Sequence, residues 1–143
     1  MKVQDIMTGD PRSLTPESTA REAAQLMKEI NAGVIPVVES NGSNKLVGVV
    51  TDRDIATRVV AAGKNSAESC ATDCMSTPAI SVTCDTSLQE CCELMETHQI
   101  RRVPVVDGQG GVVGIVSLAD VVRSANTATT VAVVKEVSSG VGN

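Results

Sequence analysis

Two short motifs pair a hydroxyl residue with an aspartate three positions later: Thr51-x-x-Asp54 and Ser117-x-x-Asp120. Each follows an apolar run, so a strand is expected to end and a helix to begin at the hydroxyl. A hydroxyl beside the free backbone N–H groups of a helix start suits an anion such as phosphate. A carboxylate one turn later can accept hydrogen bonds from the 2′- and 3′-hydroxyls of a ribose. The same spacing is also an ordinary capping box, so binding and capping are both open interpretations.

A pair of arginines, Arg101-Arg102, stands shortly before the second motif. Their forked guanidinium groups suit phosphate oxygens, so the pair is expected to add positive charge to one of two sites. Gly33-Val34 precedes the first motif at a similar distance and brings no charge. Arg53, within the first motif, is a further candidate. The alternative is that these arginines are solvated or pair with surface carboxylates.

The amino-acid composition argues against two classes of binding partner, nucleic acids and membranes. The 143 residues contain 17 acidic and 12 basic side chains, a net charge of −5, and no Phe, Tyr or Trp. A basic face for duplex nucleic acid or a membrane surface would need the opposite balance, and stacking of single-stranded bases would need aromatic rings. No run approaches the roughly eighteen apolar residues of a membrane span, and the start lacks an export signal. The sequence therefore predicts a cytoplasmic protein that contacts neither nucleic acid nor membrane.

The thiols and the single imidazole are the groups that could bind a metal: Cys70, Cys74, Cys84, Cys91, Cys92 and His98. An odd number of cysteines without framework spacing is typical of reduced thiols rather than disulfides. The sequence has no C-x-x-C, the spacing that zinc sites favour. Adjacent Cys91 and Cys92 are expected to fill the core as small apolar residues. No metal site, no catalytic residue and no enzyme activity are predicted.

The chain carries an internal repeat. A shift of 68 residues places 15–39 on 83–107, including the tripeptide Pro-Val-Val at 36–38 and 104–106. A loop that is two residues shorter in the second copy follows, after which a shift of 66 superimposes the two hydroxyl–aspartate motifs. The difference in length falls where turn residues cluster. A duplicated structural unit is therefore predicted.

Each copy shows the same order of elements. A β-rich stretch leads to a capping-box signature, Thr19-x-x-Glu22 or Ser87-x-x-Glu90, followed by apolar residues at helical spacing. Two Val/Ile-rich runs separated by a turn then indicate a strand pair, and a second helix begins at the hydroxyl motif. The predicted pattern is β-α-β-β-α in each copy, an α+β fold. The expected organisation is repeat 1 at 1–61, a linker at 62–71, repeat 2 at 72–126, and a tail at 127–143 with a short helix near 131–137.

These features resemble paired cystathionine-β-synthase (CBS) domains. The resemblance rests on Asp-Ile-Met near the start, on Pro-Val-Val before each turn, and on Gly-Val-Val-Thr-Asp-Arg-Asp-Ile at 48–55 with Gly-Ile-Val-Ser-Leu-Ala-Asp-Val at 114–121. It covers about residues 1–125. It implies a stand-alone tandem pair, a Bateman module, in which two repeats pack with pseudo-two-fold symmetry, usually as a homodimer. It also implies adenosine nucleotides bound in clefts between the repeats.

From this resemblance the expected function is ligand sensing. AMP, ADP or ATP would bind without any required cofactor and alter the chain's own assembly or an unidentified effector protein. The residues expected to hold sugar and phosphate are Thr51, Asp54, Ser117 and Asp120, assisted by Arg101, Arg102 and Arg53. With no aromatic side chain available, adenine would lie between aliphatic groups: Ile80 and Val103 beside Ser117, and Leu14 or Ile35 beside Thr51. Two alternatives stay open, a dimerisation scaffold that binds no ligand and a thiol or metal sensor.

Overall fold

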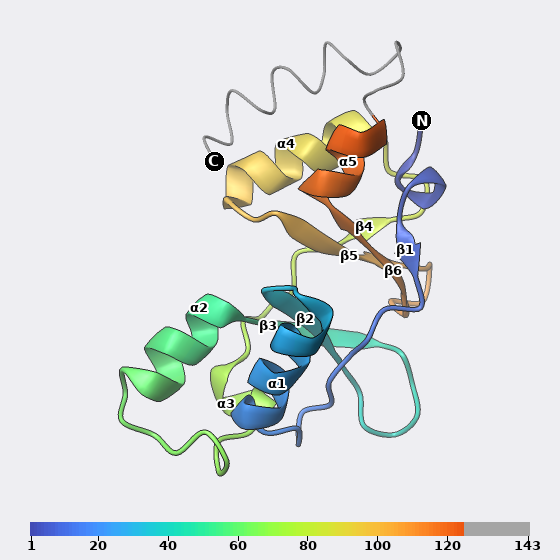
Figure 1. The fold of residues 1–143 in the computed structure, drawn as a ribbon. Coiled ribbons are helices and arrows are strands. Elements are labelled where there is room, and N and C mark those ends of the chain that lie inside the picture. Colours follow the sequence, from blue (N-terminus) through green and yellow to red (C-terminus); the bar gives the residue numbers. More distant parts are fainter. Residues whose placement is uncertain (125–143) are drawn as a thin grey trace. The chain divides into compact units, whose positions relative to one another are not determined.

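The computed structural model describes residues 1–124 and divides into two compact units (Figure 1). The Ser117 unit combines Met1–Pro11, Ser81–Gly108 and the described residues from Val113 onward. The Thr51 unit combines Arg12–Ile80 and Gln109–Val112. Helices and strands occur in both units, which confirms the α+β class with two repeats. The tail helix predicted near 131–137 lies outside the described residues.

The Ser117 unit is built on a sheet of four strands. Its order is β1-β6-β5-β4, with β1 at Thr8–Gly9, β6 at Val112–Ser117, β5 at Arg102–Val106 and β4 at Val82–Thr83. β4 runs parallel to β5, and β1 runs antiparallel to β6. Figure 1 shows α4 (Leu88–His98) and α5 (Leu118–Ser124) together on one face of this sheet. The core between these layers consists of small and medium apolar side chains: Val3, Val82, Leu88, Cys91, Cys92, Met95, Val103, Val105, Val116 and Val121.

The Thr51 unit is built on a two-stranded antiparallel hairpin. β2 (Val34–Val38) pairs with β3 (Leu46–Thr51), and Leu14 adds a parallel bridge to β2. The helical segments of the unit are α1 (Ala20–Ile30), α2 (Asp52–Ile55), the π-helix η2 (Ala56–Val60) and α3 (Ala71–Cys74). Its core also consists of small and medium apolar side chains: Leu14, Ala20, Ala23, Leu26, Met27, Ile35, Val37, Val50, Val59, Ala71 and Cys74.

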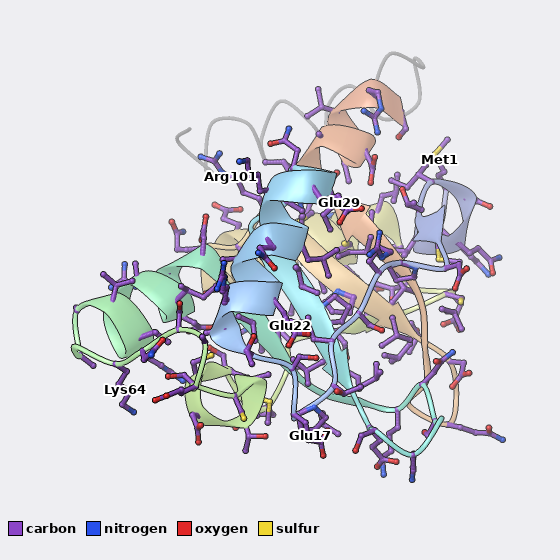
Figure 2. All side chains as sticks on the ribbon, turned by 60° about the horizontal axis from the view of Figure 1, so that its bottom comes forward. Met1, Glu17, Glu22, Glu29, Lys64 and Arg101 are labelled. Atoms are coloured by element: carbon purple, nitrogen blue, oxygen red, sulfur yellow. The ribbon has the colours of Figure 1, made fainter. Side chains whose placement is uncertain are left out.

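The first long helix of each repeat begins at the capping signature predicted from the sequence. In α1 the Thr19 hydroxyl accepts from the Glu22 N–H at 3.0 Å, and Glu22 is exposed near the helix start (Figure 2). In α4 the Ser87 hydroxyl accepts from the Glu90 N–H at 3.1 Å. These bonds satisfy backbone donors that a helix start would otherwise leave free. Among residues 1–124, no helix has the length and apolar character needed to cross a membrane.

Each compact unit takes its N-terminal segment from the other sequence repeat. The 3₁₀ helix η1 (Val3–Asp5) belongs to the Ser117 unit, where Val3 is fully buried and its N–H donates to the Thr86 carbonyl at 2.9 Å. Ser76, which follows α3, exchanges two backbone hydrogen bonds of 2.8 and 3.1 Å with Val49 in β3. The spatial units therefore differ in composition from the repeats read along the chain.

Candidate functional site

The second hydroxyl–aspartate motif lies where β6 ends and α5 begins. The Ser117 N–H donates to Asp120 Oδ2 at 3.0 Å, and the Asp120 N–H donates to the Ser117 hydroxyl at 3.0 Å. One turn further, the Arg123 guanidinium pairs with Asp120 Oδ1. The motif is therefore a complete capping box, and both oxygens of a carboxylate that is only 11% exposed have partners.

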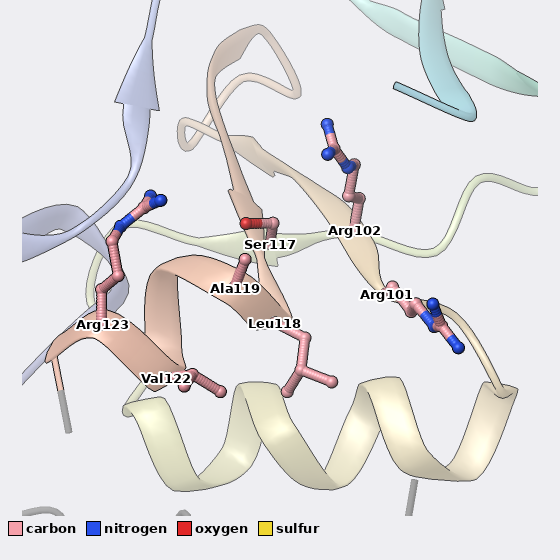
Figure 3. Close-up of a pocket in the computed structure, with 7 residues that line it drawn as sticks. All are labelled: Arg101, Arg102, Ser117, Leu118, Ala119, Val122 and Arg123. Atoms are coloured by element: carbon pink, nitrogen blue, oxygen red, sulfur yellow. The ribbon is translucent and has the colours of Figure 1, made fainter. Parts of the chain in front are cut away.

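A pocket of about 690 Å³ opens beside this junction (Figure 3). Its walls come from the start of β5, the end of β6 and α5, and they consist of Arg101, Arg102, Ser117, Leu118, Ala119, Val122 and Arg123. In Figure 3, Arg102 and Arg123 extend to the same side of the junction with Ser117 between them, whereas Leu118 and Val122 point toward α4. Three candidates from the sequence, Arg101, Arg102 and Ser117, are thus brought together.

All the charged side chains that line this pocket are positive. Three of the seven lining side chains are arginines and none of the seven is acidic. Arg101 is exposed, Arg102 is half-buried, and neither forms an ion pair with any residue in the described range 1–124. Guanidinium groups bind phosphates and carboxylates through paired N–H donors. The pocket therefore suits an anionic ligand, although the chain as a whole carries a net charge of −5.

The first hydroxyl–aspartate motif forms the same capping box, but the other groups that contact its carboxylate differ from those around Asp120. The Thr51 N–H donates to Asp54 Oδ2 and the Asp54 N–H donates to the Thr51 hydroxyl, both at 3.0 Å. The Ser76 hydroxyl lies 3.0 and 3.1 Å from the two carboxylate oxygens, and Arg58 Nε lies 3.8 Å from Oδ1. The Asp54 side chain is 8% exposed. Groups of the chain itself therefore surround this carboxylate.

The surroundings of the two motifs also differ in charge. A Cβ added at Gly33 would lie 2.8 Å from a carboxylate oxygen of Asp52, and the Asp52 N–H donates to the Gly33 carbonyl at 2.9 Å. The repeat places Arg101 and Leu118 at these positions in the Ser117 unit, where the Leu118 N–H donates to the Arg101 carbonyl at 2.8 Å. The backbone contact is shared, but one copy presents a carboxylate and the other a guanidinium.

The remaining candidates lie away from the pocket walls. Val103 and Ile35 are fully buried in the cores of their units, and Leu14 is 5% exposed. Ile80 is half-buried at the end of the Thr51 unit, and Arg53 is exposed on α2. Neither these five side chains nor that of Asp120 is among the residues that line the pocket of the Ser117 unit.

Four lining residues were not among the candidates from the sequence: Leu118, Ala119, Val122 and Arg123. Leu118 and Ala119 lie inside the second motif, so their position could have been inferred from the motif alone. Arg123 follows Asp120 by three residues, a spacing that brings two side chains together on a helix surface. This spacing could have predicted the ion pair between Arg123 and Asp120 from the sequence.

The cysteines do not form a site among the described residues. Cys91 and Cys92 are fully buried, which confirms that they fill the core. Burial raises the pKa of the Cys91 thiol to about 12 and that of Cys92 to about 11, so both stay protonated near neutral pH. Within residues 1–124, no three His, Cys, Asp or Glu side chains are grouped so that they could hold a metal ion.

Comparison with known proteins relates both halves of the chain to one family. The family model described as CBS domain matches residues 3–61 and again residues 71–126. The CBS domain-containing protein YhcV of Bacillus subtilis (strain 168) is 45% identical over 118 residues, which span 82% of this chain and 81% of that protein.

Solved structures of similar chains agree with this relationship. Hypoxic Response Protein I with two coordinated zinc ions matches with a TM-score of 0.78 and 34% identity, covering 86% of this chain and 98% of that one. CBSX2 in complex with AMP matches with a TM-score of 0.73 and 28% identity over 87% and 95% of the two chains. The CBS domain pair of MJ0100, in complex with 5′-methylthioadenosine and S-adenosyl-L-methionine, matches with a TM-score of 0.74 and 30% identity over 87% and 94%.

Proposed function

Because this chain belongs to the CBS-domain family, we propose that it is a regulatory module whose second repeat binds a phosphate-bearing adenosine ligand: AMP, ADP or ATP. The complexes of CBSX2 and MJ0100 support an adenosine ligand. The observation that carries the proposal is the pocket at the β6–α5 junction, where three arginines line the wall together with Ser117 and no lining residue is acidic.

Each part of such a ligand has a complementary group in the wall of this pocket or, for the ribose, beside it. The guanidinium groups of Arg101, Arg102 and Arg123 would hold the phosphate, and the Ser117 hydroxyl would donate a further hydrogen bond. The adenine would lie on the α4 side of the pocket wall, against the apolar side chains of Leu118 and Val122. Asp120, at the edge of the same junction, would accept from the ribose hydroxyls.

The proposal assigns one ligand to each chain. The Asp54 carboxylate already accepts from the Ser76 hydroxyl, and the Asp52 carboxylate lies beside Gly33, where an anion would be repelled. The regulatory output would pass to an effector protein or change the association of the chain with a second copy. A ligand acts in this way only through unequal affinity for two states, and no chemical reaction is required.

Calorimetric melting with and without adenosine, AMP, ADP and ATP tests the proposal. A ligand at one hundred times its Kd stabilises the folded state by about 2.7 kcal/mol, which raises the melting temperature by about 5–10 °C for a chain of this size. S-Adenosyl-L-methionine, whose sulfonium is cationic, should give a smaller shift than AMP because the arginines repel it. The double variant R101A/R102A should lose most of the AMP shift, whereas R12A, which removes an exposed arginine paired with Glu29, should keep it.

A scaffold that binds no ligand is the competing function. It is favoured by one observation: both motif aspartates already serve as helix caps, which explains their presence without a ligand. If none of the adenosine compounds shifts the melting temperature, the sensor proposal is wrong and the scaffold is the better account.

A further inference from the structure

The guanidinium of Arg123 belongs to two arrangements at once. It pairs with Asp120 Oδ1, and it also lines the pocket together with Arg101 and Arg102. The side chain of Arg123 is 74% exposed, so it can change partner without leaving a buried position. Figure 3 shows it extending to the same side of the junction as Arg102.

We propose that Arg123 is a specificity-determining latch that covers the ribose-binding oxygen of Asp120 until the phosphate of a ligand draws the guanidinium away. This inference rests on the proposed function and names the groups that select a phosphorylated ligand over a nucleoside. The same arginine then has opposite effects on two classes of ligand. It assists a nucleotide and hinders a nucleoside.

The hydrogen bonds of Asp120 determine what the latch covers. Oδ2 accepts from the Ser117 N–H at 3.0 Å, a bond that caps α5 and is needed in either state. Oδ1 makes no bond that the helix start needs, so it is the oxygen more open to a sugar hydroxyl, and it is the oxygen that Arg123 occupies. A ribose that approaches without a phosphate must break this ion pair with no replacement partner for the guanidinium.

A phosphate changes the balance because it offers the guanidinium a second anion with more charge. An ion pair with one largely exposed partner contributes little, so its loss is easily offset. A charge-assisted, bidentate contact with a phosphate is among the stronger hydrogen-bonded contacts available to arginine. Binding of the phosphate and of the ribose is thereby coupled through one side chain.

The first motif contains no equivalent device. Arg58, which approaches Asp54, also donates to the carbonyl oxygen of Met75 at 2.8 Å and to that of Cys74 at 3.3 Å. The other side-chain partner of Asp54 is the Ser76 hydroxyl, which is uncharged and cannot form an ion pair with a phosphate. The releasable contact is therefore specific to Arg123.

Titration calorimetry of R123Q with adenosine and with AMP tests the latch. We expect R123Q to weaken AMP by about tenfold, because a charge-assisted contact is lost, and to tighten adenosine by about two- to fivefold, because Oδ1 is free. R123K, which keeps the charge without the fork, should lie between wild type and R123Q. R12Q is the matched control, since it changes an exposed, carboxylate-paired arginine outside the pocket and should alter neither ligand. Melting of the ligand-free variants checks that all are folded.

The outcomes separate the latch from the function on which it rests. If wild type binds AMP and R123Q leaves adenosine affinity unchanged or weakens it, the latch is wrong while the sensor stands. If adenosine is too weak to measure in wild type, measurable binding in R123Q supports the latch and continued absence overturns it. In a D120N background, adenosine affinity should no longer respond to R123Q, and a persistent gain would contradict the mechanism. If wild type binds no adenosine compound, the proposed function itself fails.

Discussion

Asp54 and Asp120 occupy the same position in two copies of one motif, yet their carboxylates have different third partners. Asp54 is held by the Ser76 hydroxyl and by Arg58, which reach it from residues on either side of the linker. Asp120 is held by Arg123, whose side chain is exposed. A buried carboxylate with fixed partners stabilises its unit, whereas one with a releasable partner can take part in binding.

The contribution of Ser76 can be measured against its counterpart in the repeat. S76A should lower the free energy of unfolding by about 1–2 kcal/mol, because a largely buried carboxylate loses the one hydroxyl proton that its two oxygens share. The melting temperature should fall by about 3–7 °C. Thr8, the equivalent residue, is exposed, and T8A should cost much less. Equal losses in the two variants would show that the Ser76 hydroxyl has no special role.

At the scale of the elements, each compact unit contains the segment that precedes the main part of the other unit in the chain. Met1–Pro11 belongs to the Ser117 unit, and the residues just before Ser81 belong to the Thr51 unit. A Cβ at Gly48 would lie 2.8 Å from the Met75 sulfur, and a Cβ at Gly114 would likewise meet the Met7 side chain. Each glycine therefore admits a methionine from a segment that precedes the other repeat. Stability of either unit thus depends on residues distant in sequence.

The inner face of α4 is built from thiols at the positions that α1 fills with alanine. Cys91 corresponds to Ala23, and both are fully buried; Cys92 corresponds to Ala24, which is exposed. The helices of the two repeats therefore bury different widths of their surface. Two protonated thiols in a core make stability fall with rising pH, beginning in the range where the free thiols of the unfolded chain ionise.

The sign of this pH dependence follows from the raised pKa values of Cys91 and Cys92, about 12 and about 11 against 9.0 for an unperturbed thiol. The stabilisation is complete below the unfolded pKa and is lost as pH rises toward the folded values, since only the unfolded chain ionises in between. Between about pH 8 and about pH 10.5, each thiol should cost wild type about 2 kcal/mol, so wild type should lose roughly 4 kcal/mol more than C91A/C92A in urea unfolding. Parallel pH profiles for the two proteins would contradict this expectation.

At the scale of the whole molecule, charge is distributed unevenly. The chain has a net charge of −5, yet three of its 12 basic residues line one pocket. The equivalent place in the Thr51 unit carries the Asp52 carboxylate beside Gly33. The two repeats therefore share a fold, but of these two equivalent places only the one in the Ser117 unit suits an anion.

This asymmetry predicts a single nucleotide per chain. Titration calorimetry with AMP should give a stoichiometry of one, and D54N should leave AMP affinity unchanged within about twofold. Affinity should fall as salt rises from about 0.01 M to about 0.1 M, because exposed guanidinium groups are screened over that range. Two equivalent sites per chain, or an affinity indifferent to salt, would count against the charge argument.

Local features of the fold could be predicted because their causes are local. The capping boxes join residues three apart, so Thr19, Ser87 and the two motif hydroxyls marked helix starts directly in the sequence. The β-α-β-β-α order followed from apolar periodicity and turn residues, and the duplication followed from comparing the chain with itself. Arg101 and Arg102 could be predicted as a local positive charge because they are adjacent in the sequence.

Contacts between distant residues could not be predicted in this way. The Ser76 hydroxyl reaches Asp54 across 22 residues. Ile35 and Val103, proposed to contact adenine, are fully buried in their cores, because apolar residues on neighbouring strands pack against helices. Sequence alone therefore determined the repeats, their elements and the motif positions. Tertiary structure decided which carboxylate is enclosed and which arginines share a pocket, because packing brings together residues whose spacing along the chain carries no signal.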